Sequence, residues 1–173
     1  GRDGARRGPA GLGGASRGGA QRPPLRFARR ILHSVIRPGG NRSHHDPDDA
    51  DAYAAARARM VETQLRPRGI RDPRVLAAMG SVPREAFVPL RLRELAYADE
   101  ALPIEHGQTI SQPLMVGLMT ALLAPEPGAR VLEVGTGSGY QAAVLAALGC
   151  RVTTMELVPD LAATARERLV ALG

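Results

Sequence analysis

Two acidic residues flank a glycine-rich segment in the C-terminal half of the chain. The segment reads Gly135-Thr136-Gly137-Ser138-Gly139, follows an apolar run and precedes a stretch rich in Ala and Leu. Glycines let the backbone turn sharply and let a ligand approach it closely. Glu133 stands two residues before Gly135, and Glu156 stands 21 residues after it. This spacing predicts a nucleotide-binding loop between a strand and a helix, with an acidic residue on either side.

The loop differs from the pattern of dinucleotide-binding enzymes, because its third glycine comes one residue early. A carboxylate at Glu133 would repel a pyrophosphate but suits the amino group of a cationic sulfonium cofactor. Glu156 is placed to accept hydrogen bonds from ribose hydroxyls. The combination predicts an S-adenosylmethionine site. A dinucleotide site and a tight turn without a ligand remain the alternatives.

Strand and helix patterns alternate around the loop. Apolar runs predict strands over 130–134 and 151–156, and helical spacing predicts helices over 138–148 and 159–172. This order implies parallel strands joined by right-handed crossovers. We therefore expect an α/β, Rossmann-like fold in which the sheet begins within residues 130–173.

Residues 51–124 are expected to form a helical region before the sheet. Asp48 or Asp49 can cap a helix that runs to about Leu65, where Pro67 and Gly69 end it. The further expected elements are a helix over 73–79 capped by Asp72, turns near 82–85 and 89–95, an extended piece at 102–104 and a helix over 112–123.

Residues 1–50 have a different composition. They contain 10 of the 20 glycines and carry a net charge of +6, whereas residues 51–173 have no net charge. Only Leu25–Ile36 shows helical apolar spacing, so we expect a mostly disordered basic tail. An RNA-binding arm is the alternative. Because few aromatic residues accompany the glycines, we expect no nucleic-acid partner.

The composition indicates in which compartment the protein works and whether it binds a metal. The single cysteine, Cys150, suits a reducing compartment, and the sequence has no apolar run long enough for a membrane span or a secretory signal. We expect a cytoplasmic, monomeric protein without membrane contact. His44 and His45 lack a second cluster of ligands, so no metal site is expected.

Four segments give the chain a specific resemblance. They read MVETQLRPRGIRDPRVLAAMGSVPREAFVP, AYADEALPI, GQTISQPLMVGLMTALL and VLEVGTGSGYQAAVLAALG. Together they resemble the protein-L-isoaspartate (D-aspartate) O-methyltransferase family over Met60–Gly173. The resemblance implies transfer of a methyl group from S-adenosylmethionine to the α-carboxylate of L-isoaspartyl residues in damaged proteins and peptides, as part of protein repair.

The resemblance also implies site residues. The active-site serine of the family falls on Ser111, and a plain helix cap is the alternative role for that residue. A carboxylate is already ionised at neutral pH and can attack a sulfonium methyl without a base or a metal. We expect His106 to lie exposed in a loop and Tyr140 to pack over the cofactor pocket. The residues expected to contact the cofactor are Gln108, Thr109, Ile110, Ser111, Glu133, Val134, Gly135, Thr136, Gly137, Gly139, Glu156 and Leu157.

Only two strands of the expected sheet lie before Gly173. A doubly wound sheet has more strands, and two alone would leave an open edge and an uncovered apolar face. We therefore expect a fold truncated at its C-terminal side, which folds poorly and has little activity by itself. Another S-adenosylmethionine-dependent methyltransferase and a cofactor-binding fragment without catalysis are the alternative functions.

Overall fold

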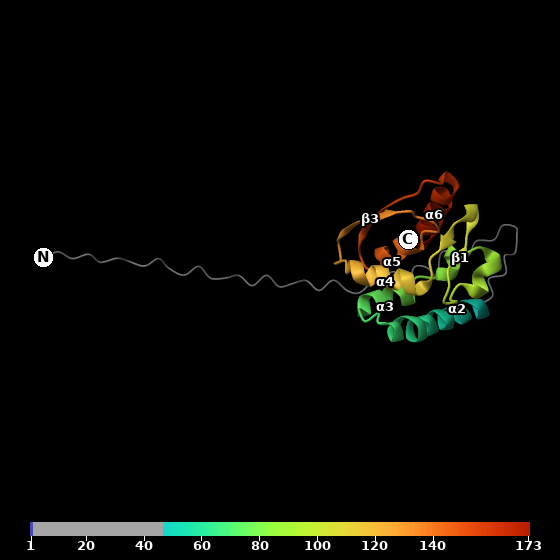
Figure 1. The fold of residues 1–173 in the computed structure, drawn as a ribbon, viewed down its shortest axis with the longest axis horizontal. Coiled ribbons are helices and arrows are strands. Elements are labelled where there is room, and N and C mark those ends of the chain that lie inside the picture. The colour runs from blue at the N-terminus through green and yellow to red at the C-terminus, as the bar shows by residue number, and fades with distance from the viewer. Residues whose placement is uncertain (2–46) are drawn as a thin grey trace.

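A computed structural model describes Gly1 and residues 47–173 of this chain. In chain order the main elements are α2 (Pro47–Met60), α3 (Pro73–Ser81), β1 (Leu102–Pro103), β2 (Thr109–Ile110), α4 (Pro113–Leu123), β3 (Arg130–Val134), α5 (Tyr140–Ala147), β4 (Arg151–Met155) and α6 (Pro159–Leu172). Helices α2, α3 and α4 lie on one side of the fold, and the parallel strand pair lies on the other side together with α6 (Figure 1). Short 3₁₀ turns at Arg84–Phe87 and Leu90–Leu95 join α3 to β1.

The predicted tail lies outside the described residues, except for Gly1 and residues 47–50. The helical spacing at 25–36 and the pair His44 and His45 also lie outside them. Residues 47–50 belong to α2, which begins at Pro47. Asp48 and Asp49, the predicted caps, lie inside the helix, so the predicted start was two or three residues late. Proline is favoured in the first turn of a helix because that turn does not need its missing N–H.

The first predicted helix changes its geometry before it ends. The α-helix gives way to a π-helical stretch at Val61–Leu65 and then to a 3₁₀ turn at Arg66–Arg68. Gly69 ends the run with a φ of 94°. The predicted end near Gly69 is correct, and the π-helical segment brings both Val61 and Leu65 into the core.

The cap predicted for the next helix is confirmed. The Oδ1 atom of Asp72 accepts a hydrogen bond from the Arg74 amide at 2.8 Å, and α3 then runs to Ser81, two residues beyond the predicted end. Buried side chains of α3 join those of the π-helical stretch, α5 and β1 in one hydrophobic cluster. This cluster holds the helical region against α5, which packs on β4.

β3 and β4 form a parallel pair in which Glu133 lies opposite Thr154. One face of the pair is half-buried against helices, whereas the other face is open. On the open face the side chains of Leu132, Val134 and Met155 are 61%, 78% and 51% exposed. The α/β architecture and the parallel pairing agree with the prediction, as does the uncovered apolar face.

Three element boundaries near the sheet differ by one or two residues from the predicted ones. α5 begins at Tyr140 rather than at Ser138, because Gly139 adopts a φ of 92°. β4 ends at Met155, one residue before the predicted end at Glu156. α4 begins at Pro113 with Gln112 in the N-cap position.

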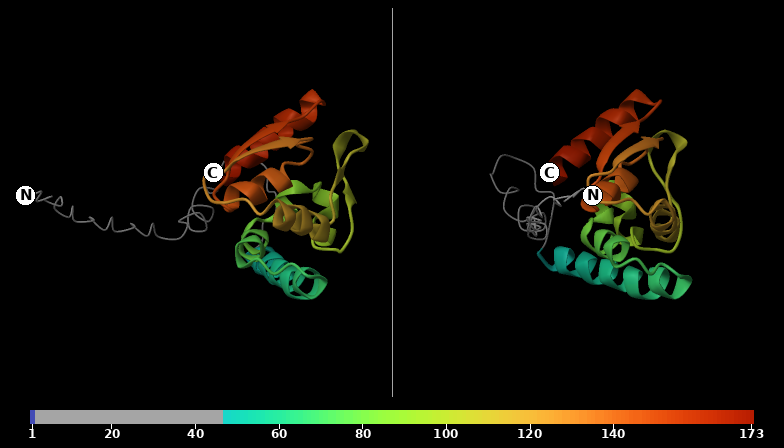
Figure 2. Two further views of the ribbon diagram at one scale, coloured as in Figure 1. Left: turned by 60° about the vertical axis from the view of Figure 1, so that its left-hand side comes forward. Right: turned by 90° about the vertical axis from the view of Figure 1, so that its left-hand side faces the viewer.

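The extended piece at 102–104 pairs with a second short strand that the sequence did not predict. β1 and β2 run antiparallel, with Leu102 opposite Ile110. The hairpin projects beside the strand pair and α6 (Figure 2). No helix among the residues that the structure describes is long and apolar enough to cross a membrane.

Candidate cofactor-binding site

The glycine segment folds into a loop whose amides are bound internally. The amides of Gly135 and Thr136 both donate to the carbonyl of Met155, at 2.8 and 3.1 Å, and the Gly139 amide donates to the Thr136 carbonyl at 2.9 Å. Gly135 and Gly139 have φ values of 90° and 92°, which side chains other than hydrogen rarely allow. The loop is thus fastened to the carboxyl end of β4.

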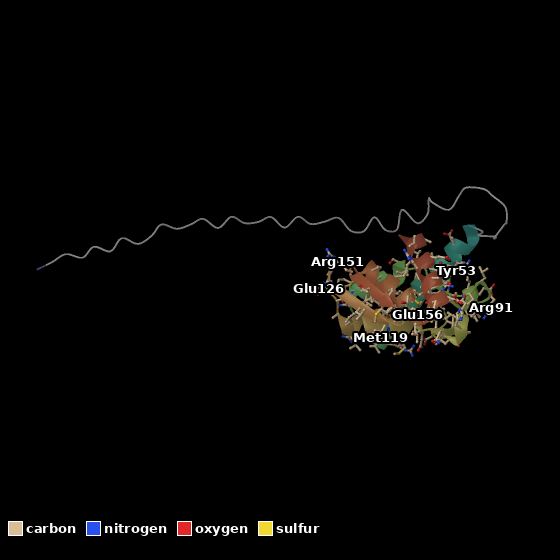
Figure 3. All side chains as sticks on the ribbon, turned by 90° about the horizontal axis from the view of Figure 1, so that it is seen from above. Tyr53, Arg91, Met119, Glu126, Arg151 and Glu156 are labelled. Atoms are coloured by element: carbon tan, nitrogen blue, oxygen red, sulfur yellow. The ribbon has the colours of Figure 1, made fainter. Side chains whose placement is uncertain are left out.

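The carboxylate of Glu156 closes the loop from the other side. Its Oε2 atom accepts the Gly137 amide at 2.8 Å, and its Oε1 atom accepts the amides of Leu157 and Val158 at 2.9 and 3.1 Å. The Gly137 amide and the other two amides hold the pKa of Glu156 below its usual value. Glu156 lies at the opposite end of β4 from Arg151 (Figure 3).

This arrangement bears on the kind of ligand that the loop accepts. A pyrophosphate needs free amides, but those of Gly135, Thr136, Gly137 and Gly139 already have acceptors within the described chain. An ionised carboxylate also stands against the loop at Gly137. A ligand with hydroxyl or ammonium donors therefore fits the loop better than a dinucleotide phosphate does.

Glu133 lies on the half-buried face of the strand pair. Its Oε2 atom accepts a hydrogen bond of 2.5 Å from the Thr154 hydroxyl. Burial raises the pKa of Glu133, and the bond from Thr154 lowers it by a smaller amount. The other carboxylate oxygen, Oε1, has no protein partner within the described residues and can accept a hydrogen bond from a ligand.

The β1–β2 hairpin lies against the glycine loop and α6. A Cβ atom built on Gly137 would stand 3.9 Å from the Cδ1 atom of Ile104, which follows β1 directly. At the hairpin tip, Glu105 Oε1 lies 3.6 Å from Arg168 Nη2, and His106 Nε2 lies 3.5 Å from Asp160 Oδ2. The two contacts at the tip join residues more than 50 positions apart in the sequence. Together with Ile104 they hold the hairpin, which leads into the segment 108–111, against the loop and α6.

The members of that segment differ in exposure. Gln108, Thr109 and Ser111 are exposed, whereas Ile110 is buried in the core. Ser111 precedes the N-cap residue Gln112, so the alternative role as a simple helix cap is wrong for Ser111. Its hydroxyl has no hydrogen-bond partner in the described part of the chain.

The predicted loop contacts also differ in exposure. Val134, Gly135 and Leu157 are exposed, Gly137 is partly exposed, and Thr136 and Gly139 are buried. The Thr136 hydroxyl lies 2.6 Å from that of Thr154. Exposed backbone at Gly135 and Gly137 leaves room for a ligand at the end of the strands.

Tyr140 occupies a different place from the one that the sequence suggested. Its side chain is buried in the core, edge-on to Phe87 with ring centroids 5.5 Å apart. The guanidinium carbon of Arg84 lies 4.9 Å from the centre of the Tyr140 ring, and Arg84 Nε donates to the Ala96 carbonyl at 2.6 Å. Burial raises the pKa of Tyr140 to about 12. The residue anchors the start of α5 from within the core.

Two further contacts were not foreseen from the sequence. Gln112, which follows Ser111, donates from Nε2 to the carbonyl and the Oδ1 atom of Asp99, at 2.8 and 2.7 Å. His106 is exposed, as expected, but it adopts a φ of 58° and faces Asp160. Neither contact has a signal in the sequence, because each joins residues whose proximity depends on how the hairpin packs.

Comparison with known proteins assigns the chain to a family. Residues 56–173 match the family described as protein-L-isoaspartate(D-aspartate) O-methyltransferase. The chain belongs to this family. The fold and the recognition made from the four sequence segments are thereby confirmed.

Individual relatives carry the same name. The chain is 57% identical over 133 residues to protein-L-isoaspartate O-methyltransferase 1 of Rhodopseudomonas palustris (strain HaA2), a match that covers 76% of this chain and 54% of that protein. It is 62% identical over 129 residues to protein-L-isoaspartate O-methyltransferase 2 of Anaeromyxobacter sp. (strain Fw109-5), covering 75% and 53%.

Solved structures agree with the fold. A Plasmodium falciparum protein-L-isoaspartate O-methyltransferase, solved in complex with S-adenosyl-L-homocysteine, superposes with a TM-score of 0.56 at 31% identity. The superposition covers 65% of this chain and 54% of that chain. This chain therefore spans about half the length of the relatives that it matches.

Proposed function

We propose that this chain carries the cofactor-binding loop and the catalytic serine of a protein-L-isoaspartate O-methyltransferase. The reaction is methyl transfer from S-adenosylmethionine to the α-carboxylate of L-isoaspartyl residues, and the substrates are damaged proteins and peptides. The observation that carries the proposal is the contact of the hairpin with the glycine loop, at Ile104 and Gly137. This contact supports a position of the segment 108–111 beside the loop, in a chain that belongs to this family.

The polar groups of the site fit an S-adenosyl ligand. Glu156 is held ionised by three amides and can accept hydrogen bonds from ribose hydroxyls. The Oε1 atom of Glu133 can accept one from an amino group. A Cβ built on Gly135 would meet no atom within 4 Å, so the backbone there is open to a ligand. We propose that the S-adenosyl ligand also contacts these further residues: Gln108, Thr109, Ile110, Ser111, Val134, Thr136, Gly137, Gly139 and Leu157.

The methyl transfer requires the protein mainly to align the methyl donor and the acceptor carboxylate. Bound S-adenosylmethionine supplies an electrophilic methyl group on a sulfonium centre. The acceptor carboxylate is ionised at neutral pH, so no residue of this chain has to act as a general base. The exposed Ser111 hydroxyl can donate a hydrogen bond that orients the acceptor carboxylate. The amino end of α4 lies two residues further on, and its dipole favours an anion at this point.

The test combines binding with transfer. Calorimetry should detect binding of S-adenosyl-L-homocysteine to this chain. Transfer of labelled methyl to an isoaspartyl peptide should be measured on this chain and on a chimera that adds the remaining C-terminal part of the Anaeromyxobacter relative. In the chimera, Ser111→Ala should lower transfer at least about tenfold and lower affinity for S-adenosyl-L-homocysteine by a smaller factor, because the lost hydrogen bond orients the acceptor carboxylate.

A matched control is Ser81→Ala. Ser81 donates to the Ala78 carbonyl at the end of α3, and its loss should leave transfer unchanged. Equal transfer by the Ser111→Ala chimera would refute the catalytic assignment. Cofactor binding without any peptide methylation by the chimera would favour a cofactor-binding protein without catalysis. A cytoplasmic location and a monomeric state remain predictions from the sequence.

A further inference from the structure

Three polar side chains form a continuous hydrogen-bond chain beneath the glycine loop. Thr154 on β4 donates to Glu133 on β3 at 2.5 Å, and its hydroxyl lies 2.6 Å from that of Thr136 in the loop. Glu133 and Thr154 are opposite partners in the parallel register. Their side chains share the half-buried face of the strand pair, where water competes little for these bonds.

The hydrogen bonds from Thr136 through Thr154 to Glu133 all run in one direction. A hydroxyl has a single proton, and Thr154 gives its proton to the carboxylate. The Thr136 hydroxyl must therefore donate to Thr154. A proton donor in the loop is thus linked to a carboxylate on β3 through one intermediate hydroxyl on β4, and removal of that hydroxyl breaks both bonds at once.

Thr136 lies at the point of the loop where the backbone has the most conformational freedom. It stands between Gly135 and Gly137, which have φ values of 90° and 54°. Glycines on both sides give this backbone more conformational freedom than any other neighbours would. Thr136 is buried and is held through its amide by Met155 and through its hydroxyl by Thr154. Its side chain therefore restricts a segment that would otherwise be free to move.

We propose that Thr154 is a positioning residue of the cofactor site, which acts through Thr136 on the loop and through Glu133 on the ligand. By occupying Oε2 of Glu133 it directs the free Oε1 oxygen to the ligand. By accepting the proton of Thr136 it fixes the loop before the ligand binds. The statement about the ligand rests on the function proposed above, whereas the statement about the loop does not.

The test compares two threonines that are adjacent on β4. Thr154→Val keeps the branched shape but removes the hydroxyl, and Thr154→Ser keeps the hydroxyl. The matched control is Thr153→Val, the same substitution on the exposed face of the strand pair. Hydrogen exchange should be followed at the amides of Gly135 and Thr136, and affinity for S-adenosyl-L-homocysteine should be measured by calorimetry.

Thr154→Val should speed exchange at both amides about tenfold and weaken affinity about tenfold, because two hydrogen bonds of ordinary strength are lost. Thr154→Ser should restore both values, and Thr153→Val should match the unmodified chain. If Thr154→Val does not fold, Thr136→Val cuts the same link from the loop side and should speed exchange in the same way. The double variant should add little to the Thr154→Val change, because Thr154→Val already breaks both bonds.

Two different failures can be told apart. Equal exchange in the Thr154→Val and Thr153→Val chains would overturn the proposal, whatever the ligand. Failure of the chimera described above to bind S-adenosyl-L-homocysteine would instead count against the proposed function. The exchange comparison would still decide whether Thr154 positions the loop.

Discussion

Gly135 offers the clearest test of the loop geometry. It has a φ of 90°, and a Cβ added there would meet no other atom within 4 Å. The substitution Gly135→Ala therefore causes no clash within the described structure and only forces a side chain into the left-handed region. That conformation costs about 1–2 kcal/mol for a residue with a Cβ. Unfolding in urea should report a loss of this size.

Gly128 provides a matched control outside the loop. It precedes β3, has a φ of 85°, and likewise has open space where a Cβ would stand. Gly128→Ala should therefore lower the free energy of unfolding by the same 1–2 kcal/mol, for the same reason. The two variants differ only in what their new methyl groups face.

Ligand binding should separate the two variants. At Gly135 the methyl group enters the space that we assign to the cofactor, so affinity for S-adenosyl-L-homocysteine should fall at least about tenfold, or about 1.4 kcal/mol. At Gly128 the affinity should not change. Equal affinities for the two variants in calorimetry would refute the placement of the ligand, and an unaltered stability of Gly135→Ala would refute the strain argument.

Substitutions at two further residues test charges within the fold. Backbone amides hold the pKa of Glu156 below its usual value of 4.5, so its ionised form stabilises the fold above pH 4.5 and this contribution is lost as the pH falls through the lowered pKa. The difference in urea midpoint between the unmodified chain and Glu156→Gln should therefore shrink between about pH 6 and pH 3. Arg84 is fully buried, and its Nη1 and Nη2 atoms have no hydrogen-bond partner among the described residues. Arg84→Met should consequently stay within about 1 kcal/mol of the unmodified stability, because a buried charge is replaced by an apolar chain of similar length, whereas Arg84→Ala should lose about 3 kcal/mol to a cavity. Thermal unfolding of both variants measures this difference. A large loss of stability in Arg84→Met would show that the guanidinium makes a stabilising contact stronger than its hydrogen bond to the Ala96 carbonyl.

Local patterns predicted the elements that depend on neighbours in the sequence. The apolar run before Gly135 predicted β3 with its observed bounds, and Pro159 marked the first residue of α6. The cap at Asp72 also needed only residues two positions apart. Such features are readable because turn and helix geometry repeats over a few residues.

Elements that depend on distant partners were missed or misplaced. β2 was missed, because its two residues are too few for an alternating pattern to stand out, whereas the extended piece that contains β1 was predicted at 102–104. Tyr140 looked like a neighbour of the pocket, but packing against Phe87 and Arg84 turns it into the core. The sequence showed which residues adjoin the loop and could not show which way their side chains point.

The sequence by itself determined the glycine loop, its two acidic neighbours and the α/β order, because each depends on spacing along a single stretch of chain. The tertiary structure decided what those residues do. Parallel pairing sets Thr154 opposite Glu133, and the return of the chain after β4 brings Glu156 to Gly137. The hairpin lies against the loop and α6 through Ile104, Glu105 and His106, whose partners are distant in the sequence. Contacts between segments follow from the register and packing of the whole fold, which no local pattern encodes.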